Sequence, residues 1–138
     1  MRNLKIALDT NCLLQILGAR SKYHFLFKQF LDNKYTLCVS TEILFEYEEI
    51  LRQKASASTA DLFLKVIAHS RNIVRKDPYF RLHMVRKDED DNKFIDCAFA
   101  CQADYIVTND SHFSDIAETP FPRFQIIDLD TFANIQLR

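Results

Sequence analysis

Short, largely apolar runs separated by helical patterns constrain the fold of this chain most strongly. Five such runs have residues compatible with buried strands: 4–8, 36–39, 73–74, 104–108 and 124–127. Helical stretches, and no hairpin turns, connect them. Strands joined in this way pair in parallel and are covered by helices on both faces. The sequence therefore predicts an α/β fold, a three-layer α/β/α arrangement around a mostly parallel central sheet.

The connecting segments carry apolar residues at helical spacing. The predicted helices are 10–17, 21–33, 41–51, 58–69, 88–101 and 131–137. Ser40 or Thr41 is expected to cap the third of them. Ser58 and Asp61 resemble a capping box at the start of the fourth, with Leu62 on its inward face.

Composition limits the class of protein. The chain has 138 residues, 16.2 kDa and 48% apolar residues, which predicts a single domain over 1–138. Its only glycine is Gly18, so neither glycine-rich phosphate-binding motif can be written. No apolar run approaches a signal-peptide core or a membrane span, so we expect a cytoplasmic protein with no membrane contact. A net charge of -1 excludes a uniformly basic surface for nucleic acid.

The cysteines and histidines show no pattern of a metal site or a catalytic triad. The cysteines lie among apolar neighbours without a C-x-x-C pair: Cys12, Cys38, Cys97 and Cys101. We interpret them as packing residues, with half a metal site at Cys97 and Cys101 as the weaker alternative. The histidines are interpreted as structural or surface residues: His24, His69, His83 and His112.

Carboxylates stand where chemistry is expected in such a sheet. Asp9 follows the first strand and Asp110 the 104–108 strand, and ligands bind at the carboxyl ends of parallel strands. Glu46 and Asp91 can reach the same crevice from two helices. Four converging carboxylates repel one another, and a bound cation relieves this. Ligation by oxygen alone favours Mg²⁺ or Mn²⁺ over zinc.

Each acid also has a plain structural interpretation. Asp9 and Asp110 could be helix N-caps, and 88–91 could be a solvated helix start that the helix dipole favours. Glu46 lies beside Glu48 and Glu49 on a polar helix surface. The convergence of all four acids, not any one of them, carries the metal hypothesis.

Four short motifs in order resemble those of the PIN domain family, in particular its branch of VapC-like toxins from toxin–antitoxin systems. They are Leu8-Asp9-Thr10-Asn11, Ser40-x-x-x-Leu44-x-Glu46, Asp88-x-Asp90-Asp91-Asn92-Lys93-Phe94, and Ala103-Asp104-Tyr105-Ile106-Val107-Thr108-Asn109-Asp110-x-x-Phe113. The resemblance covers nearly the whole chain. In this branch glycine often stands where this chain has Asn109.

The resemblance implies a Mg²⁺- or Mn²⁺-dependent endoribonuclease. Its acidic quartet matches Asp9, Glu46, Asp91 and Asp110, with Asn11 and Thr108 as supporting residues. Asp9, Asp91 and Asp110 would hold a metal that activates water, and a second metal would lie near Glu46. The implied partners are RNA and a small antitoxin protein, with a homodimer or higher oligomer also expected.

The third metal ligand has alternatives in the acidic run. Asp90 and Asp96 compete with Asp91, which we prefer for its distance to the apolar pair that follows. Asp96 lies about 140° further round the helix from Asp91. It therefore either contacts a metal through water or faces solvent.

A basic segment precedes the acidic run, with seven of the eighteen basic residues between positions 71 and 93. We expect Arg81, Arg86 and Lys87 to bind RNA phosphates, because an acidic site needs a flanking basic patch. Tyr79, Phe80 and His83 could stack on bases. The alternative is an ordinary solvated loop.

Two other functions compete with the ribonuclease. A haloacid-dehalogenase-type phosphatase needs a second Asp two residues after Asp9, and Asn11 stands there. A non-catalytic PIN-like module that binds RNA or protein would retain the fold without needing all four acids.

Overall fold

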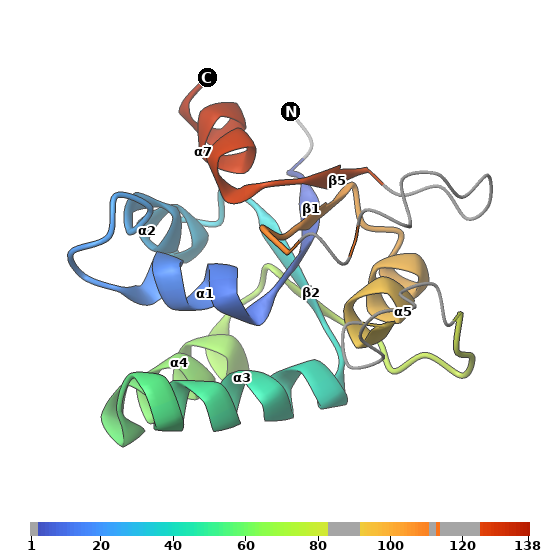
Figure 1. Cartoon of the computed structure of the whole chain (residues 1–138), viewed down its shortest axis with the longest axis horizontal. Coiled ribbons are helices and arrows are strands. Elements are labelled where there is room, and N and C mark those ends of the chain that lie inside the picture. Colours follow the sequence, from blue (N-terminus) through green and yellow to red (C-terminus); the bar gives the residue numbers. More distant parts are fainter. Residues whose placement is uncertain (1–2, 83–91, 111–112, 114–124) are drawn as a thin grey trace.

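Five parallel strands form the centre of the molecule (Figure 1). The computed structural model describes residues 3–82, 92–110, 113 and 125–138. The strands are β1 (Lys5–Leu8), β2 (Thr36–Val39), β3 (Ile73–Arg75), β4 (Tyr105–Val107) and β5 (Ile126–Ile127). Their order is β3-β2-β1-β4-β5, and every adjacent pair is parallel. This confirms the predicted parallel sheet.

Helices cover both faces of the sheet. They are α1 (Thr10–Leu17), α2 (Phe25–Leu31), α3 (Thr41–Lys54), α4 (Ala57–His69), α5 (Asn92–Cys101) and α7 (Leu129–Leu137). Helix α5 packs on β1, β2 and β4, whereas α1 and α2 lie on the other side of the sheet (Figure 1). The neighbouring helices α3 and α4 pack on each other, and α3 also contacts α1 and α5. The three-layer α/β/α prediction is therefore confirmed.

Helix starts follow local capping chemistry. Ser40 caps α3, its Oγ accepting a hydrogen bond of 3.2 Å from the Ile43 amide, as predicted. The predicted capping pair at α4 is wrong, because Ser56 rather than Ser58 accepts from the Thr59 amide, at 3.0 Å.

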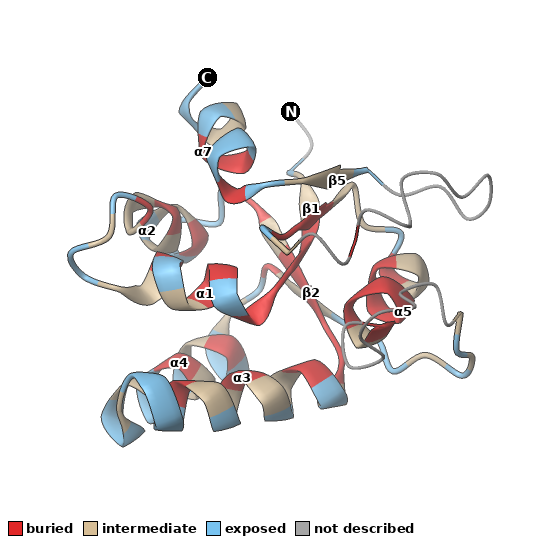
Figure 2. Cartoon of the chain, viewed as in Figure 1, coloured by how far each residue is buried: buried red, intermediate tan, exposed pale blue. Residues whose placement is uncertain are grey.

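The apolar core lies between the sheet and the inner sides of the helices (Figure 2). Leu62 was expected there, but it is 60% exposed and its neighbour Phe63 is buried instead. All four cysteines are buried and free, in agreement with their interpretation as packing residues. Within the described ranges, no helix is both long and apolar enough to span a membrane.

The strand order places the carboxyl ends of β1 and β4 side by side. Leu8 pairs with Val107, so the residues that follow them emerge at the same edge of the sheet. The chain adds β2 and β3 on one side of β1, and β4 and β5 on the other. Such a reversal of strand order is where open α/β sheets form their ligand-binding crevice.

Candidate active site

Thr108 connects the two aspartates at this crevice. Its Oγ1 donates a hydrogen bond of 2.9 Å to Asp9 Oδ2 and accepts one of 3.0 Å from the Asp110 backbone amide. The Asp9 amide in turn donates to the Val107 carbonyl at 3.0 Å. Asp9 occupies the N-cap position of α1, but its side chain makes no capping hydrogen bond. Its carboxylate faces the end of β4 instead.

The Asp9 carboxylate is in an unfavourable environment for a negative charge. Asp9 is only 6% exposed, and desolvation by burial raises its pKa above the ordinary value of 3.8. The Thr108 hydrogen bond opposes this shift, whereas the charges of Asp110 and Glu46 add to it. The charges of Asp110 and Glu46 therefore act on the same carboxylate. A bound cation would relieve both the desolvation and the repulsion.

Glu46 is held by two residues that the sequence analysis did not single out. Its Oε1 lies 2.9 Å from Lys93 Nζ, and its Oε2 accepts a hydrogen bond from the Thr10 hydroxyl. The Lys93 side chain is 12% exposed and that of Glu46 is 27% exposed. Thus α1, α3 and α5 meet at the Glu46 carboxylate. The signal in the sequence that could have found them is their position, because Thr10 directly follows Asp9 and Lys93 closely follows the acidic run.

Asp96 does not face solvent, which corrects one of its two predicted roles. It is 1% exposed, and its Oδ1 accepts a hydrogen bond of 2.9 Å from the Leu82 amide. Its Oδ2 lies 3.7 Å from Arg81 Nη1. Asp96 thereby attaches the segment after β3 to α5. Helix α5 is buried along most of its length, which is why a position predicted to be exposed is not.

Arg81 is anchored at the rim of the site. Its Nη2 lies 2.6 Å from Glu42 Oε1 on α3, and its side chain is 51% exposed. Tyr79 is fully exposed, whereas the Phe80 ring packs edge-on against Phe99 with centroids 5.2 Å apart. Of Tyr79 and Phe80, only Tyr79 therefore has a ring that is exposed to solvent.

Several residues with predicted roles in the site lie outside the described residues: Asp90, Asp91, Arg86, Lys87 and His83. His112, interpreted as a structural or surface residue, lies outside them as well. Among the residues that the structure does describe, no three acidic, histidine or cysteine side chains are placed to hold a metal ion. The described donors are nevertheless of the right type, because Asp9, Asp110 and Glu46 offer hard carboxylate oxygens. The predicted third ligand, Asp91, stays a prediction.

The two predicted supporting residues differ in position, and a third residue joins them. Thr108 is buried between the aspartates, whereas Asn11 is exposed on α1. Asn109 was noted only as a departure from the family pattern. Its Oδ1 accepts a hydrogen bond of 3.0 Å from the Leu129 amide, which fixes the end of β4 to α7.

A depression of about 230 Å³ adjoins the Glu46–Lys93 pair. Its lining mixes cationic, acidic and hydroxyl groups: Ser40, Thr41, Glu42, Asp77, Pro78, Arg81 and Lys93. It lies at the carboxyl ends of β2 and β3, the same edge of the sheet as Asp9. An extended polar chain could enter the site through it.

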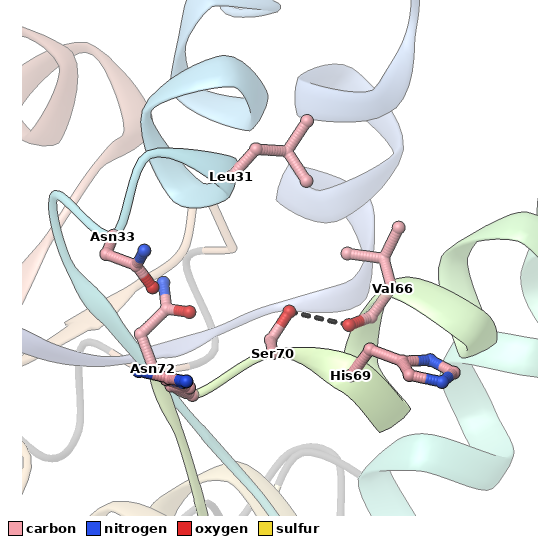
Figure 3. Close-up of a pocket in the computed structure, with 7 residues that line it drawn as sticks. Leu31, Asn33, Val66, His69, Ser70 and Asn72 are labelled. Carbon is pink, nitrogen blue, oxygen red and sulfur yellow. Dashed lines mark hydrogen bonds between the residues drawn. The ribbon is translucent and has the colours of Figure 1, made fainter.

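A larger cavity of about 380 Å³ lies at the opposite, amino end of β2 and β3 (Figure 3). Asn72 and Ser70 line it, and the amide nitrogen of Asn72 and the hydroxyl of Ser70 donate to backbone carbonyls. Asn72 Nδ2 donates to the Phe30 and Tyr35 carbonyls, and Ser70 Oγ donates to the Val66 carbonyl. Of the predicted catalytic acids that the structure describes, Asp9, Glu46 and Asp110, none borders this cavity.

A model of the PIN domain family matches residues 5–112, which include every predicted catalytic acid. The chain belongs to the PIN domain family. Membership removes the haloacid-dehalogenase-type phosphatase as an alternative. No curated protein matches the chain.

Solved structures share the fold of this PIN domain. VapBC2 from Rickettsia felis, bound to a fragment of promoter DNA, aligns with a TM-score of 0.63 and 17% identity over 92% of this chain and 100% of that chain. VapC20 from Mycobacterium tuberculosis, a toxin that cleaves the sarcin-ricin loop, aligns with a TM-score of 0.55 and 14% identity over 79% of this chain and 92% of that chain. The PIN domain endonuclease Utp24 aligns with a TM-score of 0.54 and 17% identity over 91% of this chain and 84% of that chain. The chain is thus a PIN-fold protein like known nucleases and toxins.

Proposed function

We propose that this PIN domain is a Mg²⁺- or Mn²⁺-dependent endoribonuclease and the toxin of a toxin–antitoxin pair. The observation that carries the proposal is the convergence of Asp9 and Asp110 on Thr108 at the reversal of strand order. A buried carboxylate with a raised pKa, beside other acids, is the environment that a divalent cation stabilises.

Asp9, Asp91 and Asp110 are the residues that would hold the metal. A divalent ion bound there would make water a stronger nucleophile and polarise the scissile phosphate. Thr108 fixes the rotamer of Asp9 by its hydrogen bond, which keeps the carboxylate directed to the crevice. The backbone amide of Asp110 is held by the same hydroxyl, so one side chain sets the spacing of both acids.

RNA would approach along the depression beside Glu42 and Arg81. The Arg81 guanidinium is half exposed and fixed at the rim, so it can contact a phosphate without leaving its place. Arg86 and Lys87 follow it in the sequence and would extend the positive charge. Exposed Tyr79 offers a ring on which a base can stack.

The toxin assignment rests on the neighbouring structures. VapBC2 is a toxin–antitoxin complex, and VapC20 is a toxin that cleaves RNA at the sarcin-ricin loop. By this likeness the chain would bind a small antitoxin protein, and a homodimer or higher oligomer is part of the same proposal. We place the activity in the cytoplasm, where RNA and Mg²⁺ are both present.

The test is metal-dependent cleavage of labelled RNA by Asp9→Asn and Asp110→Asn variants. Each substitution keeps size and hydrogen bonding but removes the charge that a hard cation requires. We expect a loss of activity of about 100-fold or more in each. Asp32→Asn is the matched control, because Asp32 is exposed at the end of α2.

Three outcomes separate the alternatives. Cleavage that is lost in both site variants and kept in Asp32→Asn supports the nuclease. RNA binding without cleavage by the unmodified protein would support a non-catalytic module. Unchanged cleavage by a pure Asp9→Asn sample would refute the assigned centre.

A further inference from the structure

The Glu46–Lys93 ion pair bears on the number of metal ions that the site can take. Two-metal nucleases place their ions about 3.5–4 Å apart, each with its own carboxylate oxygens. Glu46 is the described acid that could serve a second ion beside Asp9 and Asp110. Its two oxygens are instead engaged by Lys93 Nζ at 2.9 Å and by the Thr10 hydroxyl.

The Lys93 ammonium is held in place, unlike a surface lysine. Its side chain is only 12% exposed, and its Nζ also lies 5.8 Å from the centre of the Phe94 ring. Lys93 belongs to the first turn of α5, whose following residues Phe94 and Ile95 are fully buried. The backbone under the ion pair is therefore fixed by the core, and the charge stays near Glu46.

A second cation at Glu46 would meet this charge directly. Mg²⁺ binds carboxylate oxygen at about 2.0–2.1 Å. An ion on Oε1 would therefore lie within about 5 Å of Lys93 Nζ, at which distance a divalent and a monovalent cation repel strongly in a poorly solvated site. An ion on Oε2 would also have to displace the Thr10 hydroxyl.

We propose that the Lys93 ammonium takes the place of a second metal ion at Glu46, so that the active site of this chain binds one metal ion. Glu46 is then a positioning residue, which holds Lys93 and Thr10, and the metal is left to the aspartates. The inference rests on the proposed metal site and specifies its stoichiometry. It also assigns the positive charge next to Glu46 to a side chain of the protein.

The experiment counts Mn²⁺ ions per chain by electron paramagnetic resonance, in which free Mn²⁺ gives a signal that is lost on binding. Two ions about 4 Å apart also couple magnetically and give a distinct spectrum. We expect the unmodified protein to bind one uncoupled Mn²⁺ that is lost in Asp9→Asn. Lys93→Met should bind a second, coupled ion about tenfold or more tightly than the unmodified protein does.

Matched variants separate the charge of Lys93 from its packing. Lys93→Arg keeps the charge and should retain one ion, and Lys65→Met removes a lysine from the exposed side of α4 and should also retain one. Lys93→Gln repeats the Met test with a polar side chain, in case Met disturbs the fold. Glu46→Gln in the Lys93→Met background should abolish the second site.

The inference and the proposed function fail in different ways. A coupled pair of Mn²⁺ ions in the unmodified protein would overturn the inference and leave the nuclease proposal intact. One ion in both folded Lys93→Met and Lys93→Gln would also overturn it, because the ammonium would then not be what excludes the second. No Asp9-dependent Mn²⁺ at all would overturn the proposed metal site itself.

Discussion

The hydroxyl of Thr108 donates to Asp9 Oδ2 across a sequence separation of 99 residues. The same oxygen accepts the backbone amide of Asp110. One side chain therefore joins the end of β1 to the loop after β4. A residue with no charge of its own thus links the carboxylate of one acid to the backbone of the other.

Removing this hydroxyl should weaken the metal site without removing an acid. Thr108→Val keeps the shape but leaves the Asp110 amide without its hydrogen-bond acceptor. We expect Mn²⁺ affinity to fall roughly 10–100-fold, as for other partners of metal ligands. The free energy of unfolding should fall by about 1–3 kcal/mol. Thr108→Ser should restore both; a Val variant with unchanged affinity would assign Thr108 to packing alone.

The raised pKa of Asp9 gives a pH-dependent prediction for the metal-free protein. The folded state binds the Asp9 proton more tightly than the unfolded state, so ionised Asp9 destabilises the fold above its folded pKa. This cost disappears as the pH falls through that pKa, and it is absent below the ordinary value of 3.8. Asp9→Asn should therefore melt at a higher temperature than the unmodified protein at pH 7.

Thermal melting in the presence of a chelator, from pH 3.5 to 8, checks the prediction. The difference in melting temperature between Asp9→Asn and the unmodified protein should shrink as the pH falls. A constant difference would mean that the substitution acts through packing and not through ionisation.

Metal binding should stabilise the fold. At a free Mg²⁺ or Mn²⁺ concentration of 100 Kd, the expected gain in unfolding free energy is about 2.7 kcal/mol. The melting temperature should rise by several degrees and return when the metal is chelated. Asp9→Asn should show no rise; a rise of equal size in that variant would place the metal elsewhere.

The basic segment should contribute to RNA affinity in a salt-dependent way. Replacing Arg81, Arg86 and Lys87 together by Ala removes three of the positive charges that precede the acidic run. Each lost contact to single-stranded RNA should reduce the slope of log affinity against log salt by roughly 0.7. Fluorescence anisotropy at several salt concentrations measures the slope, in an Asp110→Asn background that does not cleave.

A second triple variant controls for net charge. Arg52, Lys54 and Lys65 carry the same charge on α3 and α4, and Arg52 is bound to Glu48 and Asp61. Their replacement by Ala should leave the slope nearly unchanged. Equal slopes for both triple variants would assign the basic segment to solvent.

Asn72 offers a stability test at the amino end of the sheet. Its Nδ2 donates to the Phe30 carbonyl at 2.9 Å and to the Tyr35 carbonyl at 2.8 Å. Asn72→Leu would leave both buried carbonyls without this donor, at a cost of about 2 kcal/mol or more. Urea denaturation should show the loss, with Mn²⁺ affinity unchanged. Asn134→Leu serves as the control, because Asn134 is exposed. If Asn72→Leu lost Mn²⁺ affinity together with stability, the two ends of the sheet would be coupled.

Local patterns predicted most of the fold. The strands β1, β2 and β4 were visible because largely buried parallel strands read as continuous apolar runs. The start of α4 was mispredicted because Ser56 and Ser58 are both good caps two residues apart, and only tertiary packing selects between them. The exposure of Leu62 was missed because Phe63, and not Leu62, shares a helix face with the buried residues Ala60 and Ile67.

The sequence predicted the candidate-site residues that follow strands, but not the contacts that form where two helices meet. Asp9 and Asp110 were found because each comes shortly after an apolar run, and β1 pairs directly with β4. The contact of Lys93 with Glu46 depends on how α3 and α5 meet, and a sequence separation of 47 residues carries no local trace of it. The burial of Asp96 was missed for the same reason.

The pairing of β1 with β4 also governs when the centre can exist in a growing polypeptide. Leu8 and Asp9 are synthesised 99 residues before their partners Val107 and Thr108. The end of β4 is then secured by still later residues, since the Thr108 amide donates to the Ile127 carbonyl and the Leu129 amide to Asn109. A nascent chain that stops before residue 105 lacks one wall of the crevice. The candidate centre can therefore form only after the ribosome has added the 99 residues that separate Asp9 from Thr108, and it is secured only once Leu129 has been added.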